Sequence, residues 1–479
     1  MPCRHQAAAV LLCWAFAATG EAAAPEATNP PPASGGDWRQ RRVVPIDPVV
    51  WGWNHASWDQ EKLISVGDHQ YTVFWDDDGV LVLARRDLRD DSLDRLRLPA
   101  FRLSDNDPHR NTCLGVSAAD GRLHLCWDHH GDPLRYARSR AGFLDQPPAA
   151  MTAADIEPPE PISPRSSILS RVTYPRFVSD AEGRLYLCYR QGGSGNGDHY
   201  LFRYDGQTGR WEELGKAFSG AGDYPAWEGS RSRNAYLHDL LFDADNRLHA
   251  SWVYREISAT WASNHDLHYA VSGDGGRTWR NNAGEQIADL PAGDAIAVED
   301  PGIVVRPIPV FSWLMNAGCM ALDRRQRPHV ITYHLPDPRP ADRPQHDPPA
   351  EIAAALRFVH YWRDDDGRWR GGRPITAGRE FGGVGRGDIV FDADNTLFFF
   401  YAARPDGIRP AAGGFICLEA RAADDWSSWR SSRLTGPDLS TQDASKHDRA
   451  RWREEGILSF TVGEGGAGFA IVDFVPASR

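Results

Sequence analysis

Short runs of alternating hydrophobic and polar residues recur along the chain, and each follows the same kind of turn. The clearest copies are SAADGRLHLCWD (117–128), SDAEGRLYLCYR (179–190) and FDADNRLHASWVYR (242–255). Looser copies are WDDDGVLVLARR (75–86), LDRRQRPHVITYH (322–334) and FDADNTLFFFYAAR (391–404). The Asp-Gly or Asp-Asn step supplies the positive φ angles of a tight hairpin turn. Strict alternation beside such a turn predicts half-buried antiparallel strands.

The spacing of these turns predicts the size of the repeating unit. An interval of about 60 to 70 residues fits one four-stranded blade with its loops, and helical periodicity is nearly absent. We therefore predict an all-β fold, a seven-bladed β-propeller of four-stranded antiparallel blades, formed by residues 46–479 as a single domain.

One further turn, SGDGGRTWR (272–280), has the residue spacing of an Asp box. The residues that match the spacing of the box are Ser272, Asp274, Gly276, Thr278 and Trp279. In such a box the Asp and Ser side chains cap the turn while the Trp packs between strands. An Asp box is a folding element, so it does not by itself indicate catalysis.

The beginning of the chain predicts export. Arg4 and His5 precede the apolar run AAAVLLCWAFAA, and small residues near Ala24 offer a cleavage site. The apolar run is too short for a membrane-spanning stop-transfer helix. We predict a signal peptide over residues 1–24, a disordered Pro/Gly/Ser linker over 25–45, and a secreted or periplasmic protein.

Composition limits the partners. The formal net charge is −12, whereas a nucleic-acid binder is normally basic, so we expect no nucleic-acid partner. A local cluster of Arg and His can still attract an anionic substrate to one cleft. The 18 tryptophans fit an all-β protein that uses aromatic rings for sugar stacking or for packing between sheets. We expect no membrane partner and a monomer.

The cysteines do not suggest a disulfide framework. Five remain beyond the predicted signal peptide, at positions 113, 126, 188, 319 and 417, and an odd number argues against complete pairing. Cys113 and Cys126 flank one turn, so they are either a cross-strand disulfide or buried free thiols. The sequence has no CxxC pair and no HExxH motif, and we expect no metal and no cofactor.

Candidate chemistry lies where the strands of several repeats end, because propeller sites are built there from the loops of different blades. The candidates are His109, Asn111, one of His129 and His130, Tyr174, Arg176, Arg190, Tyr236 and His238. Neighbouring residues of a strand point to opposite faces, so at most one of His129 and His130 can face a given cleft. A single histidine or tyrosine is usually a packing residue. Two histidines, two tyrosines and an arginine at equivalent places in consecutive repeats indicate a site.

Several stretches between about residue 50 and about residue 290 resemble the large family of BNR-repeat propellers, which includes ulvan lyases and related rhamnose–glucuronate lyases. They include DPHRNTCLGVSAADGRLHLCWDHHGDPLRY, VTYPRF, YRQGGSGNGDHYLFRYD and RNAYLHDLLFDADNRLHASWVYRE. The resemblance implies a catalytic domain, a polysaccharide lyase that cleaves a uronic-acid-containing polysaccharide (ulvan-like or rhamnose–glucuronate) by β-elimination. It implies a catalytic set of His109, His130, Tyr174, Arg190 and Tyr236, and it selects His130 over His129. Asn111, Arg176 and His238 are further substrate-binding candidates.

The implied chemistry fits these residue types. The C5 proton of a uronate is hard to remove while the neighbouring carboxylate is charged, and Arg190 can neutralise that carboxylate. We expect Tyr174 to protonate the leaving O4 and His109 or His130 to accept the C5 proton, with the other histidine on the carboxylate. No redox cofactor is needed.

Two other functions remain open from the sequence. A sialidase-like glycoside hydrolase would share the Asp boxes, but it needs an arginine triad that opens with an Arg-Ile-Pro-like element. The nearest match is VRPIPV at 305–310, which lies too late in the chain. A non-catalytic carbohydrate-binding propeller is the second alternative, because exposed aromatic rings can hold a sugar without cleaving it.

Overall fold

The structure is a computed structural model that describes residues 38–476, apart from 55, 57–60, 228, 258–260, 317, 338–347, 383–384, 404–412 and 444. The described residues are almost entirely strands and turns, which confirms the predicted all-β class. They belong to one compact unit, residues 34–479. The predicted signal peptide and the first part of the predicted linker lie outside the described residues.

The first half of the chain forms β1 (Trp38–Asp47), β2 (Leu63–Val66), β3 (His69–Trp75), β4 (Val80–Asp87), β5 (Leu93–Arg102), β6 (Thr112–Ser117), β7 (Arg122–Trp127), β8 (His130–Asp132), β9 (Tyr136–Arg138), β10 (Val172–Ser179), β11 (Leu185–Gly193), β12 (Asn196–Asp205), β13 (Arg210–Phe218), β14 (Ala221–Tyr224) and β15 (Ser230–Phe242). The second half forms β16 (Leu248–Glu256), β17 (Asn264–Ser272), β18 (Thr278–Arg280), β19 (Gln286–Asp289), β20 (Val304–Arg306), β21 (Cys319–Leu322), β22 (Pro328–His334), β23 (Arg357–Arg363), β24 (Trp369–Pro374), β25 (Gly387–Phe391), β26 (Leu397–Ala402), β27 (Gly413–Ala420), β28 (Trp429–Arg433), β29 (Leu439–Thr441), β30 (Leu458–Glu464) and β31 (Gly468–Pro476). The α-helices are α1 (Ala350–Ala355) and α2 (Arg449–Glu455).

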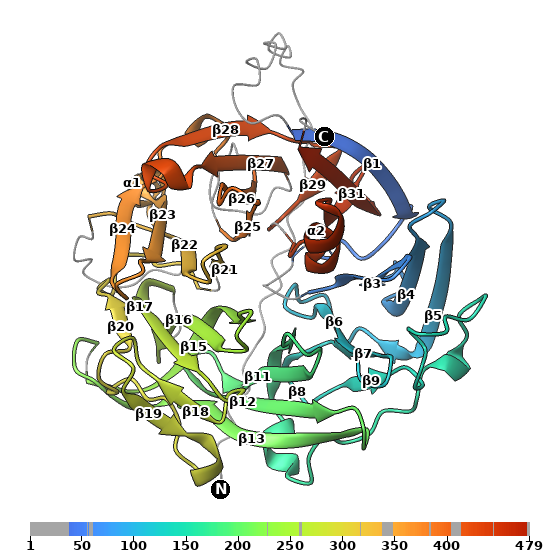
Figure 1. The fold of residues 1–479 in the computed structure, drawn as a ribbon, viewed down its shortest axis with the longest axis horizontal. Coiled ribbons are helices and arrows are strands. Elements are labelled where there is room, and N and C mark those ends of the chain that lie inside the picture. Colours follow the sequence, from blue (N-terminus) through green and yellow to red (C-terminus); the bar gives the residue numbers. More distant parts are fainter. Residues whose placement is uncertain are drawn as a thin grey trace, which may run out of the picture. The chain divides into compact units, whose positions relative to one another are not determined.

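Antiparallel pairing joins these strands into sheets that follow one another around a common centre (Figure 1). In chain order they contain β2–β5; β6, β7 and β9; β8 with β10–β13; β14–β20; β21–β24; and β1 with β25–β31. The last sheet has eight strands. It consists of two four-stranded groups that are joined only where Gly413 and Gly414 of β27 pair with Thr441 and Ser440 of β29. By connectivity alone, the sheets therefore do not divide into seven.

Hydrophobic side chains fill the spaces between consecutive sheets. One cluster joins β10–β13 to β15–β19 through residues such as Leu201, Trp252 and Trp279. Another joins the last sheet to the first, because Val44 and Phe469 pack with Phe74. The described residues contain seven hydrophobic clusters, one of which lies within the eight-stranded sheet, between its two four-stranded groups. The sheets are thus held face to face by apolar burial, which contributes roughly 25 cal/mol per Å² of buried apolar surface.

In five of the six repeated turns an Asp side chain caps the turn, and in SAADGRLHLCWD the same position is Ala118. The Asp243 carboxylate accepts the backbone N–H of Arg247 at 2.8 Å and its Nε at 2.6 Å. Asn246, one residue before Arg247, has a φ of 58°. Asp180 with Arg184 repeats this arrangement. The turn therefore needs one left-handed residue, three positions after the Asp, which favours Gly or Asn there. The looser copy LDRRQRPHVITYH has Gln326 at this position, with a φ of 62°.

The predicted Asp box has the expected geometry. Asp274 accepts the backbone N–H of Thr278 at 2.9 Å and the Thr278 hydroxyl at 2.7 Å. Ser272 Oγ accepts the backbone N–H of Gly276 at 2.8 Å. Trp279 is fully buried between strands. This confirms the box as a folding element.

The predicted linker is wrong over residues 38–45. These residues belong to β1, which pairs antiparallel with β31 so that Val44 lies opposite Ile471. Residues 38–45 are rich in charged side chains, a composition that is typical of a solvated segment. The pairing partner lies at the other end of the chain, so no local signal revealed the strand.

All five cysteines of the described residues are buried free thiols. Cys113 and Cys126 lie opposite each other on β6 and β7 without forming a disulfide. Of the two possibilities that the sequence left open, the structure has the unpaired one.

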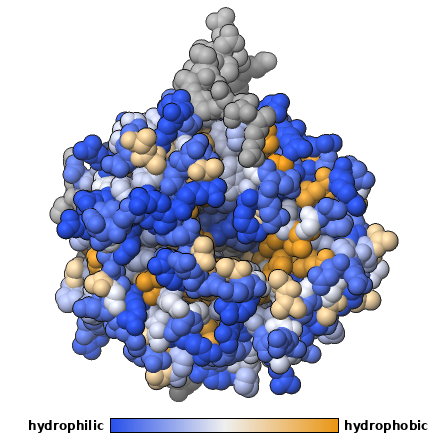
Figure 2. All heavy atoms as spheres, in the orientation of Figure 1, coloured by the Kyte–Doolittle hydropathy of each residue, from blue (hydrophilic) through white to orange (hydrophobic). Residues whose placement is uncertain are grey.

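Neither described helix has the length and apolar composition needed to cross a membrane. Hydrophilic side chains cover most of the face drawn in Figure 2, with hydrophobic ones gathered in a smaller area beside the centre. A pocket of about 790 Å³ is lined by β2, β6, β10, β15 and α2.

Charged side chains are buried near the centre, where the inner strands meet the segment between β29 and β30. Asp239 of β15 accepts from Arg176 of β10 at 2.8 Å and from Arg449 of α2 at 2.8 Å. Lys446 Nζ lies 3.3 Å from the same carboxylate. Asp239 is 3% exposed. One carboxylate thus contacts three cations, of which Arg176 and Lys446 are buried and Arg449 is half-buried.

We predict that Asp239→Asn lowers the free energy of unfolding at neutral pH by about 3–5 kcal/mol, because the carboxylate shared by Arg176, Lys446 and Arg449 would be lost while Arg176 and Lys446 stay buried. Urea unfolding measures this, with Asp245→Asn, on a side chain that is 74% exposed, as the matched control. Equal unfolding midpoints for Asp239→Asn and wild type would contradict the assignment.

Burial alone would raise the pKa of Asp239, but the charges of Lys446, Arg449 and Arg176 lower it from 3.8 to about 2. The folded-state pKa lies below the unfolded one, so the contribution is present above about pH 4 and is lost as the pH falls toward 2. The stability difference between wild type and Asp239→Asn should therefore shrink over that range.

Candidate active site

His109 and His130 form a stacked pair on one carboxylate. His109 lies in the loop between β5 and β6, and His130 begins β8. Their ring centroids are 4.1 Å apart, with an interplanar angle of 15°. Asp107 Oδ1 lies 2.5 Å from His109 Nδ1, and Asp107 Oδ2 lies 2.6 Å from His130 Nδ1. The histidine side chains are 27% and 36% exposed, so a ligand can reach both rings.

His129 points away from this pair; it lies between β7 and β8, after Asp128, which has a φ of 62°. It is 1% exposed, and its Nε2 accepts the backbone N–H of Arg135 at 2.8 Å. Burial lowers the pKa of His129 to about 3, which keeps the ring neutral. His129 is therefore a packing residue, and His130 is the member of the pair that faces His109.

Tyr174 continues the group on β10, the strand that pairs with β8. Its ring centroid lies 6.1 Å from that of His109 and 6.0 Å from that of Tyr236. The β10–β11 register shifts between Thr173 and Arg176, and Tyr174 has a φ of 54°. A non-glycine residue in this conformation costs of order 1–3 kcal/mol and is typical of functional sites. The bulge is what turns the Tyr174 side chain toward the histidines.

Arg190 lies beneath the two tyrosines. Its guanidinium carbon is 5.1 Å from the Tyr174 ring centroid and 5.7 Å from that of Tyr236. Arg190 is 2% exposed, and its Nη1 donates to the Tyr236 hydroxyl at 3.3 Å. The five predicted catalytic residues therefore form one contiguous group.

The Tyr236 hydroxyl is surrounded by donors. Besides Arg190, Arg255 Nη1 donates to it at 3.2 Å, and Ser194 Oγ lies 3.2 Å away. Burial alone would raise the pKa of Tyr236, but the charges of Arg255 and Arg190 lower it to about 8. Burial and the neighbouring Tyr236 raise the pKa of Tyr174. The two phenols are thus tuned in opposite directions.

Arg255 was not among the predicted residues. It is the penultimate residue of β16. Its guanidinium carbon lies 4.5 Å from the Tyr236 ring centroid, and its Nη2 donates to Asn316 at 2.8 Å. Arg386 donates to the Asn316 carbonyl at 3.1 Å and pairs with Asp443. The repeats contained a signal for Arg255, because it ends FDADNRLHASWVYR as Arg190 ends SDAEGRLYLCYR.

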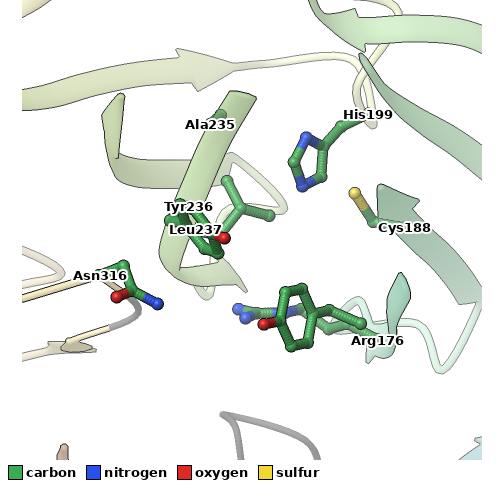
Figure 3. A pocket seen from close by; sticks show the side chains of 8 residues that line it. Arg176, Cys188, His199, Ala235, Tyr236, Leu237 and Asn316 are labelled. Atoms are coloured by element: carbon green, nitrogen blue, oxygen red, sulfur yellow. The ribbon is translucent and has the colours of Figure 1, made fainter. Parts of the chain in front are cut away.

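The three predicted substrate-binding residues are all buried. Asn111 is 2% exposed, and its Oδ1 accepts from Lys62 at 2.7 Å. His238 is fully buried, and its Nδ1 accepts the backbone N–H of Gly318 at 2.8 Å. Arg176 lines a pocket beside Tyr236, together with Cys188, His199 and Asn316 (Figure 3). Their substrate-binding role stays a prediction.

Donor atoms suited to a metal ion lie close together in three groups of the described residues. The groups are Asp107, His109 and His130; His265, Asp266 and His268; and Asp76, Asp77 and Asp78. In the first group the oxygen–nitrogen distances are 2.5 and 2.6 Å. Ligands of a tetrahedral zinc with bonds of about 2.0 Å lie about 3.3 Å apart. The geometry of this group is therefore that of hydrogen bonds.

The arrangement suits proton transfer beside an anion. A basic histidine pair and a phenol of raised pKa face the same space, with the guanidinium groups of Arg190 and Arg255 next to them. Such a set can bind a carboxylate, accept one proton and donate another.

Comparison with known proteins finds similarity to several ulvan lyases. The chain is 25% identical over 233 residues to the long isoform of ulvan lyase from Pseudoalteromonas sp. (strain PLSV), which covers 41% of this chain and 22% of that protein. It is 24% identical over 236 residues to the short isoform from Alteromonas sp. (strain LOR), which covers 41% and 43%. The chain thus spans about a fifth of the long isoforms and less than half of the short one.

The fold is shared with solved polysaccharide lyases. The crystal structure of polysaccharide lyase Uly1 matches with a TM-score of 0.62 and 14% identity over 87% of this chain and 90% of that one. A PL25 ulvan lyase bound to -[GlcA(1-4)Rha3S]- matches with a TM-score of 0.58 and 13% identity, over 90% and 95%.

The family assignment follows from the sequence profile. The profile of the BNR repeat-containing family matches residues 69–374, which is more than half of the 479 residues. The chain therefore belongs to the BNR repeat-containing family.

Proposed function

We propose that this protein is a polysaccharide lyase that cleaves a uronic-acid-containing polysaccharide, ulvan-like or rhamnose–glucuronate, by β-elimination. The observation that carries the proposal is the contiguous group of His109, His130, Tyr174, Arg190 and Tyr236. The ring centroids of neighbouring histidines and tyrosines in this group lie 4.1 to 6.1 Å apart. The ulvan lyases among the relatives support the same reaction class.

The substrate carboxylate binds to the arginines in this proposal. Arg190 and Arg255 both donate to the Tyr236 hydroxyl, so their guanidinium groups converge on one point. A guanidinium binds a carboxylate through two parallel hydrogen bonds, which neutralises its charge and makes the C5 proton more acidic. Electrostatic stabilisation of the resulting enolate-like intermediate is the largest contribution to the rate.

The proton then moves between named groups. The C5–H bond breaks, and its proton passes to Nε2 of His109 or His130. The electron pair forms the C4–C5 double bond as the C4–O4 bond breaks. Tyr174 donates its hydroxyl proton to O4, and its raised pKa keeps that proton in place until it is needed. Burial and His130 lower the pKa of His109, which keeps that ring neutral and able to accept a proton.

The site favours a lyase over a glycoside hydrolase. Hydrolases of the common kind use two free carboxylates, one on each side of the bond. Two carboxylates of the described residues that contact this group already hold basic side chains: Asp107 holds the histidine pair, and Asp132, which accepts the backbone N–H of His130, also accepts from Arg110. The arginine of VRPIPV, Arg306, lies over the Tyr361 ring at 5.8 Å. A sugar-binding protein without activity would not need two tyrosines tuned in opposite directions.

The proposal includes a seven-bladed β-propeller with an export signal. Dividing the eight-stranded sheet at the β27–β29 link yields two antiparallel four-stranded groups, one of which combines β1 with β29–β31. The seven hydrophobic clusters among the described residues each join consecutive groups, and one joins the last group to the first. Export rests on the predicted leader and on the location of polysaccharide substrates.

We predict that the purified protein raises the ultraviolet absorbance of a uronate polysaccharide solution, because elimination forms a conjugated 4,5-unsaturated uronate. Tyr174→Phe should abolish the rise, since O4 then leaves without a proton. Tyr200→Phe, on the outer side of the same sheet, is the matched control. Full activity of Tyr174→Phe would show that Tyr174 is not the proton donor. New reducing ends without a rise in absorbance would indicate a hydrolase.

We predict that Arg190→Ala lowers kcat on a uronate substrate about 100- to 1000-fold, because it removes a preorganised positive charge. Arg203→Ala, on the neighbouring strand β12 and paired with Glu212, should leave kcat near that of wild type. Steady-state kinetics with both variants measure this, and unchanged kinetics for Arg190→Ala would contradict its role.

We predict that one tyrosine ionises with a pKa of about 8. An ultraviolet difference titration of tyrosinate should lose this step in Tyr236→Phe. Arg255→Gln should move the step to higher pH, because it removes one positive charge next to the phenol. Identical titrations of wild type and Tyr236→Phe near pH 8 would rule out the assignment.

A further inference from the structure

Asp107 is a charged residue of the site to which the reaction outlined above gives no role. It lies in the loop between β5 and β6. Its carboxylate contacts both rings of the histidine pair, with Oδ1 at 2.5 Å from His109 Nδ1 and Oδ2 at 2.6 Å from His130 Nδ1. Oδ1 also accepts the backbone N–H of His109 at 2.9 Å.

The surrounding loop fixes this carboxylate in place. The backbone N–H of Asp107 donates to Asp105 at 3.0 Å. Arg110 donates to Asp105 at 2.6 and 2.9 Å and to Asp132 at 2.6 Å. The backbone N–H of His130 donates to the same Asp132 carboxylate at 3.0 Å. The two histidine backbones and the Asp107 backbone are therefore tied together through Arg110.

The contacts of Asp107 decide where the histidine protons lie. An ionised carboxylate only accepts hydrogen bonds, so both Nδ1 atoms must carry a hydrogen. A neutral imidazole carries one hydrogen, which leaves Nε2 as the basic nitrogen of each ring. Fixing Nδ1 on the carboxylate also fixes the direction of Nε2, which lies on the other side of the ring.

We infer that Asp107 is the positioning residue of the histidine pair, setting the Nδ1–H tautomer and the orientation of both rings so that one Nε2 can accept the C5 proton. This inference rests on the proposed lyase function. When the C5–H bond breaks and the proton reaches Nε2, the ring becomes an imidazolium whose Nδ1–H still points at the Asp107 carboxylate. The proton later leaves to solvent, and Asp107 itself stays ionised throughout.

The stacking of the two rings gives Asp107 a second effect. Burial and the charge of His130, whose ring centroid lies 4.1 Å away, lower the pKa of His109. The carboxylate between the rings compensates the charge of the ring that receives the C5 proton. The other ring remains correctly oriented because it keeps its own hydrogen bond to Asp107.

The kinetic test compares two aspartates of the same loop. Asp107→Asn places an NH₂ donor against one Nδ1–H and forces that ring into the other tautomer, so we expect kcat to fall about 100-fold with little change in KM. Asp107→Glu, which keeps both oxygens, should recover part of the loss. Asp105→Asn is the matched control, because it disturbs the same loop through Arg110 without contacting a histidine. An equal loss in Asp105→Asn and Asp107→Asn would reduce Asp107 to a loop-folding residue.

A double-mutant cycle separates positioning from other roles. If Asp107 acts through the histidines, Asp107→Asn should cost nothing further in a His109→Gln/His130→Gln background. A full additional loss in that background would overturn the inference.

A measurement that does not depend on activity distinguishes a failure of the positioning role of Asp107 from a failure of the proposed lyase function. In protein labelled with ring-¹⁵N histidine, the His109 and His130 resonances, assigned with the single Gln variants, should report protonated Nδ1 and unprotonated Nε2 at neutral pH. Asp107→Asn should change the tautomer of at least one of them. If no uronate polysaccharide is cleaved but this signature is present, the proposed function fails and the positioning stands. If cleavage occurs while Nε2 carries the hydrogen in both rings, or if stoichiometric Zn²⁺ binds through Asp107 and raises the activity, the positioning role is wrong.

Discussion

The ion pair between Arg176 and Asp239 links the two strands that carry the tyrosines. Arg176 stands two residues after Tyr174 on β10, and Asp239 stands three residues after Tyr236 on β15. The pair bridges two sheets at 2.8 Å, and the tyrosine rings that lie above it are 6.0 Å apart. Buried charges are costly unless each has a partner, so this contact allows little freedom of movement. The additional cations Lys446 and Arg449 come from the segment before β30. The geometry of a site made by the first half of the chain thus depends on residues near its end.

The site places chemically similar side chains in different environments. Tyr174 and Tyr236 are neighbours, yet Tyr236 receives hydrogen bonds from two guanidinium groups while Tyr174 lies over only one of them. The pKa of Tyr236 is therefore lowered, and that of Tyr174 is raised. His129 and His130 also lie in different environments. One is buried and neutral, and the other shares Asp107 with His109. Environments that separate the pKa values of like groups are typical of acid–base catalysis.

Much of this arrangement could be predicted from local patterns. Alternation and turn spacing predicted the strands, the capped turns and the Asp box, because these features depend on residues that are close in sequence. Strand alternation, together with the family resemblance, also separated His130 from His129. The strand β1 could not be predicted, because its partner β31 lies at the other end of the chain. Asn316 and Arg386 were missed because their contacts also join distant parts of the chain. Arg255 donates to Asn316, and Arg386 donates to the Asn316 carbonyl. Asp107 was missed because an Asp before Pro-His is usual in a turn, and its role depends on His130, which is 23 residues away.

The central claim is that the uronate lies between the histidine pair and the two arginines. A crystal structure of Tyr174→Phe with a glucuronate–rhamnose oligosaccharide tests this directly, because the variant should bind the substrate without cleaving it. The account predicts the uronate carboxylate within hydrogen-bond distance of Arg190 or Arg255, and C5 facing Nε2 of His109 or His130. An oligosaccharide bound instead in the pocket lined by β2, β6 and α2, or a carboxylate that contacts neither arginine, would contradict it.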